Sequence, residues 1–223
     1  MTYKITIPFY ANENLLENLM SGMDIDWRHI LLIDNSPGSL ARKYEGKGAK
    51  ILYHPENLGV AKSWNIGLKG QCDWTFFISI NATFPNGFSE VLAELNKANE
   101  WVMLTDLSWH CNAVSKMTVE KIGYFDENFY PAYFEDTDYY HRMCLAGIPC
   151  GKNGVISIPA ETTRQANSLD GGLNVNFQAL MDYYKEKWGG EPGHETLTTP
   201  WGKGELDYWV RENLNALKEK YKQ

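Results

Sequence analysis

The sequence lacks the features of a secreted, membrane-spanning or polyanion-binding protein. Its first ten residues, MTYKITIPFY, contain no apolar run of the signal-peptide kind. No stretch approaches the ~18 consecutive apolar residues of a membrane span. The formal charge of −7 argues against a nonspecific nucleic-acid binder, although a local basic face remains compatible with it. We therefore expect a cytoplasmic protein with no membrane span, for which nucleic acid is a disfavoured partner.

Cysteine is scarce, and repeats are absent. The four cysteines have no metal-ligand spacing, so we expect free thiols in a reducing compartment. No internal repeat, low-complexity tract or long linker divides the 223 residues, a length that fits one large domain with an appendage. The many aromatic residues, among them 8 Trp and 13 Tyr, are typical of a globular protein with clefts.

Apolar runs and helical patterns alternate along the first half of the chain. We expect strands at residues 2–8, 29–33, 50–53, 74–80 and 101–105. We expect helices at 12–22, 60–68 and 88–98, the first of them capped by an asparagine and closed by a glycine. This alternation predicts an α/β fold with a mostly parallel sheet and helices on both faces.

Polar or turn-forming segments follow four of the expected strands, at residues 8–12, 34–36, 54–59 and 81–83. In open parallel sheets, ligands bind beyond the carboxyl ends of the strands. Loops are polar for general reasons, but four such segments on one edge favour a ligand site there.

The end of the chain has two helical stripes, at residues 173–188 and 206–221, separated by a Gly/Pro-rich loop. We expect two amphipathic helices that pack on the sheet. The alternative is that these helices pack on a partner chain, in which case the protein is a homodimer.

The segment NFYPAYFEDTDYYHRMCLAG, residues 128–147, places three carboxylates within four residues: Glu135, Asp136 and Asp138. A packed core does not tolerate such charges unless they are solvated or paired. The acids either start a helix, where Asp136 suits a cap, or line a cleft in which a carboxylate accepts a proton.

Six stretches of the chain, in this order, resemble family 2 glycosyltransferases with the GT-A fold. They are ITIPFYANENLLENLM, LLIDNS, ENLGVAKSWNIGL, ISINAT, GYFDENFYPAYFEDTDYYHRMCLAG and, less specifically, the tail KWGGEPGHETLTTPWG. Apart from the tail, which resembles the endings of some short members, the resemblance spans about residues 3–150. It implies residues 1–165 as the nucleotide-sugar-binding and catalytic domain, and 166–223 as a C-terminal helical extension of the same globular unit.

The resemblance also implies a nucleoside diphosphate sugar donor and an inverting transfer to a glycan or small hydroxyl acceptor. It assigns the catalytic base to Asp136, with Glu135 positioning it. It places the donor beside these residues: Pro8, Tyr10, Glu13, Asp34, Ser36, Asn57, Gly59, Lys62 and Asn81.

One triplet departs from the family pattern, which has a metal-binding Asp after the fourth strand. Here the triplet is Asn81-Ala82-Thr83, with only neutral oxygens at Asn81 and Thr83, so we expect weak dependence on Mn²⁺ or Mg²⁺. His194 is the late candidate for a second ligand, although a lone loop histidine is commonly a surface residue. Lys62, Arg142, Arg164 or Lys203 are the alternatives for neutralising the diphosphate, and Asp138 is an alternative metal ligand.

Three functions follow. The first is an inverting hexosyl- or pentosyltransferase. The second is a sugar-nucleotide-binding protein that has lost catalysis, which the missing Asp allows. The third is a transferase acting on modified bases in DNA, which needs a basic groove.

Overall fold

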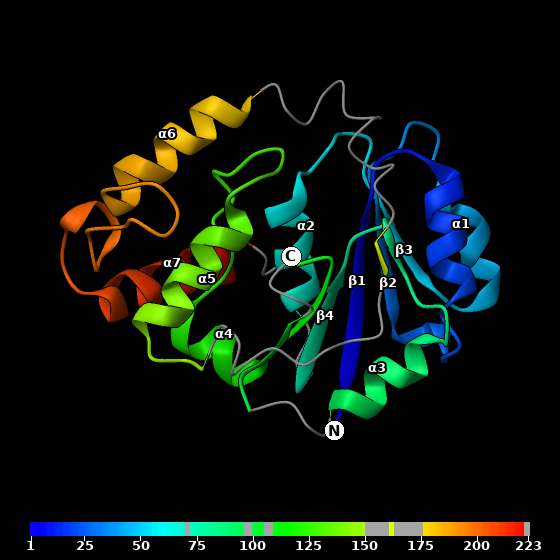
Figure 1. The fold of residues 1–223 in the computed structure, drawn as a ribbon. Helices are drawn as coiled ribbons and strands as arrows, with labels where there is room; N and C mark the ends of the chain where they lie inside the picture. Colours follow the sequence, from blue (N-terminus) through cyan, green and yellow to red (C-terminus); the bar gives the residue numbers. More distant parts are fainter. Residues whose placement is uncertain (70–71, 96–99, 105–108, 150–160, 163–175, 221–223) are drawn as a thin grey trace.

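The computed structural model describes residues 1–69, 72–95, 100–104, 109–149, 161–162 and 176–220. Its centre is a six-stranded sheet in the order β3-β2-β1-β4-β7-β6. The strands are β1 (Tyr3–Phe9), β2 (Ile30–Asp34), β3 (Lys50–Tyr53), β4 (Trp74–Ile78), β6 (Val102–Leu104) and β7 (Cys111–Ser115). Strands β1 to β4, labelled in Figure 1, pair in parallel, whereas β7 is antiparallel to both of its neighbours. The predicted mostly parallel sheet is confirmed.

The antiparallel strand β7 and the helix after it, α4 (Lys116–Ile122), were not predicted from the sequence. The strand reads CNAVS, which is neither a continuous apolar run nor a clean alternation. All five of its residues are nevertheless buried, because β4 and β6 pair with it from both sides. Tertiary pairing, not local propensity, makes this segment a strand.

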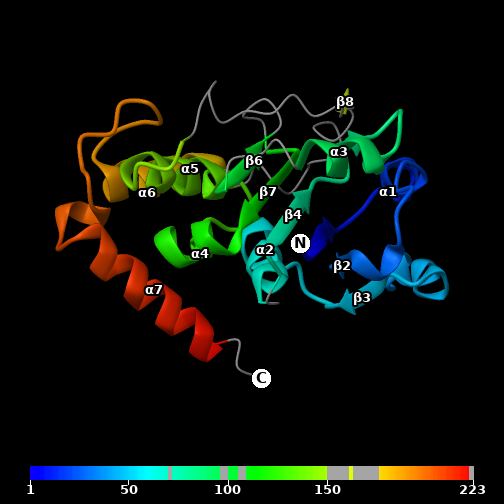
Figure 2. The ribbon, with the colours of Figure 1, turned by 90° about the horizontal axis from the view of Figure 1, so that it is seen from below.

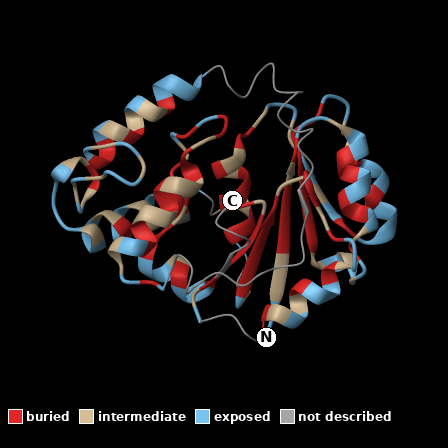
Figure 3. Cartoon of the chain, viewed as in Figure 1, coloured by how far each residue is buried: buried red, intermediate tan, exposed pale blue. Residues whose placement is uncertain are grey.

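Helices cover both faces of the sheet, as predicted (Figure 2). One face packs against α1 (Glu13–Ser21), α3 (Phe88–Glu94) and a 3₁₀ helix, η2 (Leu40–Lys47). The other face packs against α2 (Val60–Leu68), α4 and α5 (Glu135–Leu145). In β4, Phe76 belongs to the first apolar cluster and its neighbour Phe77 to the second. Successive side chains of a strand point to opposite faces, and because helices cover both faces, both rings are fully buried. Figure 3 shows that the central strands are mainly buried.

The two C-terminal helices, α6 (Phe177–Trp188) and α7 (Leu206–Lys220), pack on the same chain. Leu180, Tyr184 and Trp188 of α6 form a buried cluster with two phenylalanines that precede α5. In α7, Val210 and Leu217 are buried. Both helices therefore pack on the rest of the chain, α6 against the segment before α5 and α7 against α4, whereas the expectation was packing on the sheet. The expected stripe residues Leu173 and Tyr221 lie outside the described residues.

The helices and strands begin and end close to the residues predicted from the sequence, with small differences. The Asn12 side chain accepts a hydrogen bond from the Leu15 amide at 3.2 Å and caps α1, and Gly22 ends that helix. β4 ends two residues early, at Ile78, and the chain then turns, with the Ala82 amide donating to the Ser79 carbonyl at 3.0 Å. α3 ends at Glu94, and part of its expected extension falls outside the described residues.

None of the helices in the described ranges has the length and apolar character that a bilayer crossing requires.

Candidate functional site

The four parallel strands end at one edge of the sheet, called the carboxyl edge below. The turns after β2 and β3 are joined there: the His54 amide donates to the Asp34 carbonyl at 2.8 Å, and the Leu58 amide donates to the Asn35 side chain at 3.1 Å. Two of the predicted donor segments, residues 34–36 and 54–59, therefore lie together at the carboxyl edge. Asn35, which the sequence analysis passed over, links two of them.

Gly59 joins this edge to the segment that precedes α5. Its φ of 74° is in the left-handed region, and a Cβ there would lie 2.9 Å from the Pro131 carbonyl oxygen. The next amide, of Val60, donates to that carbonyl at 2.8 Å, and the Asn57 side chain accepts from the Gly59 amide at 2.9 Å. The start of α2 and the start of α5 are thus held side by side.

The N-terminal donor candidates differ in exposure. Pro8 is half-buried within β1, and Tyr10 is 51% exposed just beyond it. Glu13 lies on the first turn of α1, where its carboxylate forms an exposed ion pair with Lys43 at 3.0 Å. Lys62 is half-buried on the first turn of α2.

Asp34 and Ser36 are both fully buried in the turn after β2. One Asp34 carboxylate oxygen accepts from the Ser36 amide at 2.9 Å and from the Ser36 hydroxyl at 2.5 Å, and the other accepts from the Ala41 amide at 2.9 Å. The carboxylate therefore holds together the loop that follows β2.

Asp34→Ala should lower the free energy of unfolding by about 1–3 kcal/mol, because it leaves three buried donors without their acceptor. Urea unfolding of the variant and of Ser36→Ala, which removes only the hydroxyl, measures this. Equal stability of Asp34→Ala and the unmodified protein would show that the loop does not depend on the carboxylate.

The paired acids Glu135 and Asp136 are the first two residues of α5. Tyr133 and Phe134 before them have φ values of 84° and 69°, a conformation that is costly for aromatic residues and is concentrated at functional sites. Phe134, not Asp136, occupies the N-cap position. The interpretation of Asp136 as an N-cap is therefore wrong.

Burial dominates the electrostatics of the two acids. It raises the pKa of Asp136, and hydrogen bonds to one carboxylate oxygen from the Thr137 amide at 2.7 Å and the Thr137 hydroxyl at 3.2 Å partly offset this rise. Burial and the neighbouring Asp136 charge raise the pKa of Glu135 well above its ordinary range. Among the described residues, one buried Glu135 oxygen, Oε2, has no hydrogen-bond partner. Glu135 thus retains its proton to higher pH than a free glutamate, and the environments of the two acids differ.

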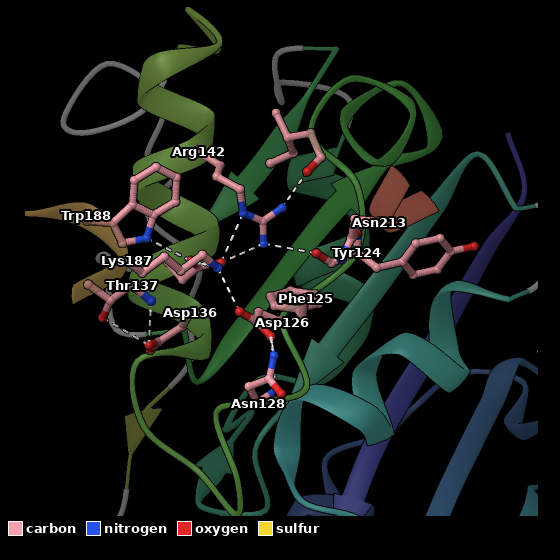
Figure 4. A network of polar contacts seen from close by, with 12 residues as sticks. Tyr124, Phe125, Asp126, Asn128, Asp136, Thr137, Arg142, Lys187, Trp188 and Asn213 are labelled. Carbon is pink, nitrogen blue, oxygen red and sulfur yellow. Dashed lines mark hydrogen bonds and ion pairs between the residues drawn. The ribbon is translucent and has the colours of Figure 1, made fainter. Parts of the chain in front are cut away.

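Behind these acids lies a buried network of two carboxylates and two cations (Figure 4). Asp138 accepts from the Arg142 guanidinium at 2.8 Å and 3.0 Å, from the Trp188 indole at 2.8 Å, and pairs with Lys187 at 2.6 Å. Lys187 also pairs with Asp126 at 2.7 Å. The side chains of Asp138, Arg142 and Lys187 are fully buried. The network fixes α6 to α5.

This network corrects two expectations. Arg142 also donates to the backbone carbonyls of Ile122 and Tyr124, so it is committed inside the protein and does not neutralise a diphosphate. Asp138 is likewise enclosed by Arg142, Lys187 and Trp188 and is not a metal ligand. Of the other cations considered, Lys203 is exposed, and Arg164 lies outside the described residues.

The two expected metal residues lie on different elements of the chain. Thr83 lies in β5 (Ala82–Thr83), which directly follows the buried Asn81. β5 pairs with β8 (Glu161–Thr162). His194 is exposed in the loop after α6, where its amide donates to the Glu191 carbonyl at 2.8 Å. Within the described ranges, no three His, Cys, Asp or Glu side chains group as a metal site requires.

Lys187 and His110 were missed by the sequence analysis. Lys187 had a signal: it follows Leu180 and Tyr184 at positions i+7 and i+3, on the apolar stripe of α6, where a cation needs a buried partner. His110 had no such signal, because no helix or strand was predicted at this residue or directly before it.

Comparisons with known proteins agree with the fold. TarS from S. aureus in complex with UDP matches with a TM-score of 0.55 and 13% identity, over 87% of this chain and 74% of that chain. Glucosyl-3-phosphoglycerate synthase from Mycobacterium tuberculosis, with Mn²⁺, UDP and phosphoglyceric acid, matches with a TM-score of 0.54 and 12% identity, over 81% and 78%. The mannosyltransferase PcManGT from Pyrobaculum calidifontis, with GDP-Man and Mn²⁺, matches with a TM-score of 0.52 and 14% identity, over 71% and 55%.

Sequence comparison gives a shorter match. A galactofuranosyl glycosyltransferase of Leishmania donovani is 51% identical over 35 residues, which are 16% of this chain and 8% of that protein. The matched part of this chain thus spans less than a tenth of its curated relative. No family model matches the chain. The sheet order, the helices on its two faces and the structural matches together identify the fold as that of the GT-A glycosyltransferases.

Proposed function

We propose that the protein is an inverting glycosyltransferase that transfers a sugar from a nucleoside diphosphate sugar to a hydroxyl acceptor. The observation that carries the proposal is the position of Glu135 and Asp136. They begin α5 at the carboxyl edge of a GT-A sheet, and the Val60–Pro131 hydrogen bond holds them beside the expected donor segment. A carboxylate in that place is suited to accept a proton from a bound hydroxyl.

The reaction moves one proton and exchanges one bond. An acceptor hydroxyl oxygen attacks the anomeric carbon of the donor while its proton passes to an Asp136 oxygen. The bond from the anomeric carbon to the diphosphate breaks, and its electron pair leaves with the diphosphate. Attack opposite the leaving group inverts the anomeric configuration. Glu135, which retains its proton more readily, positions Asp136 without competing for the proton.

We assign donor binding to the carboxyl edge. Asp34 and Ser36 shape the loop for the base, and Tyr10 and Pro8 flank it. The diphosphate lies against Asn57, Gly59 and Lys62, where the positive end of the α2 dipole and the Lys62 ammonium favour an anion. Asn81 lies at the end of the same edge, and Glu13 borders it.

The described residues do not fit a tightly held divalent ion. Asn81 and Thr83 offer neutral oxygens, whereas Mn²⁺ and Mg²⁺ prefer anionic ones. An ion carried by the donor phosphates would supply charge neutralisation there, and we expect only weak dependence on it.

The acceptor site is proposed beside the start of α6. Tyr130 and Phe177 are exposed by 46% and 40%, and the Phe177 ring contacts the Tyr133 ring at a centroid distance of 5.3 Å. Exposed aromatic faces next to the paired acids suit a glycan or another small hydroxyl compound.

A thermal-shift screen against nucleoside diphosphate sugars tests the proposal. A donor at 100 times its dissociation constant stabilises the native state by about 2.7 kcal/mol, so one class of donor should raise the melting temperature. The shift should persist in excess chelator. The second candidate is a binding protein that has no turnover, which the triplet Asn81-Ala82-Thr83 favours. Release of the nucleoside diphosphate from the donor distinguishes an enzyme from such a protein. If no sugar nucleotide stabilises the protein, both candidates fail.

A further inference from the structure

The backbone turn before the paired acids is held by aromatic packing from α6. Phe134 directly precedes Glu135, and its φ of 69° is in the left-handed region. A bulky residue keeps such a conformation only where its surroundings enforce it. The buried Phe134 ring packs against the rings of Phe177 and Tyr184 of α6, at centroid distances of 5.1 Å and 5.9 Å. The conformation at the start of α5 therefore depends on α6.

Tyr184 is the buried member of this α6 pair. It is fully buried, whereas Phe177 lies exposed on the first turn of the helix. The Tyr184 ring also faces the ring of Phe129 at 6.4 Å, and both phenylalanines that precede α5 belong to its apolar cluster. Tyr184 therefore joins the buried face of α6 to the segment that ends at Glu135.

The Tyr184 hydroxyl is fixed by Glu195, in the Gly/Pro-rich loop after α6. It donates to Glu195 Oε1 at 2.5 Å, and the Gly193 amide donates to the same oxygen at 3.0 Å. Nδ1 of His141, on α5, lies 3.8 Å from that oxygen. The Glu195 side chain is only 12% exposed. A carboxylate that is enclosed in this way holds its neighbours in place, unlike a solvated loop residue.

The loop that carries Glu195 is fastened to the end of α6. The amides of Thr196 and Leu197 donate to the Trp188 carbonyl at 3.1 Å and 3.0 Å, and the Thr196 hydroxyl donates to the Gly189 carbonyl at 2.9 Å. A Cβ at Gly190 would lie 2.1 Å from a backbone oxygen of the same loop. The loop therefore folds back on α6, which places its carboxylate against Tyr184.

We propose that Tyr184 and Glu195 are positioning residues for the paired acids Glu135 and Asp136. The loop carboxylate fixes the tyrosine, and the tyrosine ring fixes the turn that the two acids follow. The effect on transfer rests on the proposed function, whereas the fixing of the turn is a property of the folded protein. The two are therefore tested separately.

Hydrogen exchange tests the fixing of the turn and needs no activity. The Asp138 amide donates to the Phe134 carbonyl at 2.8 Å, so its exchange rate reports on the first turn of α5. E195A removes the acceptor of the Tyr184 hydroxyl. The Asp138 amide should then exchange about tenfold faster, the scale of one lost hydrogen bond. The Ala146 amide, which donates to the Arg142 carbonyl at the other end of α5, should keep its rate.

Three further variants make this test decisive. E195Q retains an oxygen acceptor and should restore slow exchange. Y184F removes the same hydrogen bond from the other side and keeps the ring, so it should match E195A and replaces it if E195A does not fold. E191A removes a carboxylate of the same loop that pairs with Lys185 at the surface, and it should behave as the unmodified protein does.

Transfer kinetics test the effect on the acids. E195A and Y184F should lower kcat about tenfold while the KM for the donor stays the same, because a small displacement of reacting groups is costly and the donor segments are untouched. E195Q should recover kcat.

Three results would overturn the proposal: an unchanged kcat in E195A and Y184F, unchanged exchange of the Asp138 amide in both variants, or a loss in E195Q equal to that in E195A. Faster exchange in E195A, in a protein that transfers no sugar, would support the fixing of the turn and count against the proposed function alone.

Discussion

Asp136→Asn should reduce turnover by roughly 10²-fold or more while donor binding persists. The amide has nearly the shape of the carboxylate, but it does not accept the acceptor's proton, and loss of a general base is commonly an effect of this size. Among the described residues, the Asp136 carboxylate accepts hydrogen bonds only from Thr137. The substitution therefore removes no hydrogen bond to a distant part of the fold. Single-turnover transfer and donor titration by calorimetry measure the two quantities separately.

Glu135→Gln is the matched control for this prediction. The glutamine is neutral, as a protonated Glu135 is, and occupies the same first turn of α5. We therefore expect a milder loss than for Asp136→Asn. Near-normal turnover of Asp136→Asn would remove Asp136 from the role of base, and an equal loss in both variants would mean that the acids act as one unit.

Lys187→Met should destabilise the fold by about 3–5 kcal/mol, the usual effect of removing one partner from a buried ion pair. Methionine conserves most of the volume, so the cost comes from charge and not from a cavity. Asp138 would keep its ion pair with Arg142, whereas Asp126 would lose the cation with which it pairs in the described structure. Urea unfolding followed by fluorescence measures the change.

Lys185→Met is the control for this second prediction. Lys185 lies two residues earlier on α6 and pairs with Glu191 at the surface, where ion pairs contribute little. If both variants unfold at the same urea concentration, the buried network does not hold α6 to the body of the protein.

The same network predicts acid sensitivity. Burial alone would raise the pKa of Asp126, but the Lys187 charge and the hydrogen bonds from Lys187, Asn128 and Tyr183 outweigh it, and the pKa lies below its ordinary value of 3.8. The contribution of Asp126 to stability is therefore complete above that value and is lost as the pH falls through the lower folded-state pKa. Lys187→Met should lose most of this dependence.

Much of the fold follows from local patterns in the sequence. The apolar run of β4 and the helical stripes of α1 and α2 have one favourable arrangement, a parallel sheet covered on both faces. That arrangement in turn brings Asp34, Asn57 and Asn81 to one edge, because parallel strands end together. The position of Asp136 at a helix start is also local, since acids favour that end of the helix dipole.

Tertiary structure alone decided the partners of these residues. Cys111 to Ser115 become a strand through pairing with β4 and β6, and this pairing is what carries His110 to the edge. Lys187 reaches Asp126 across 61 positions of the chain, and Asp138 meets Trp188 across 50. The sequence by itself determined where charge and apolar surface lie along each element. Which charges meet depends on how the elements pack, because a buried charge is stable only beside a partner that the fold, not the neighbouring sequence, provides.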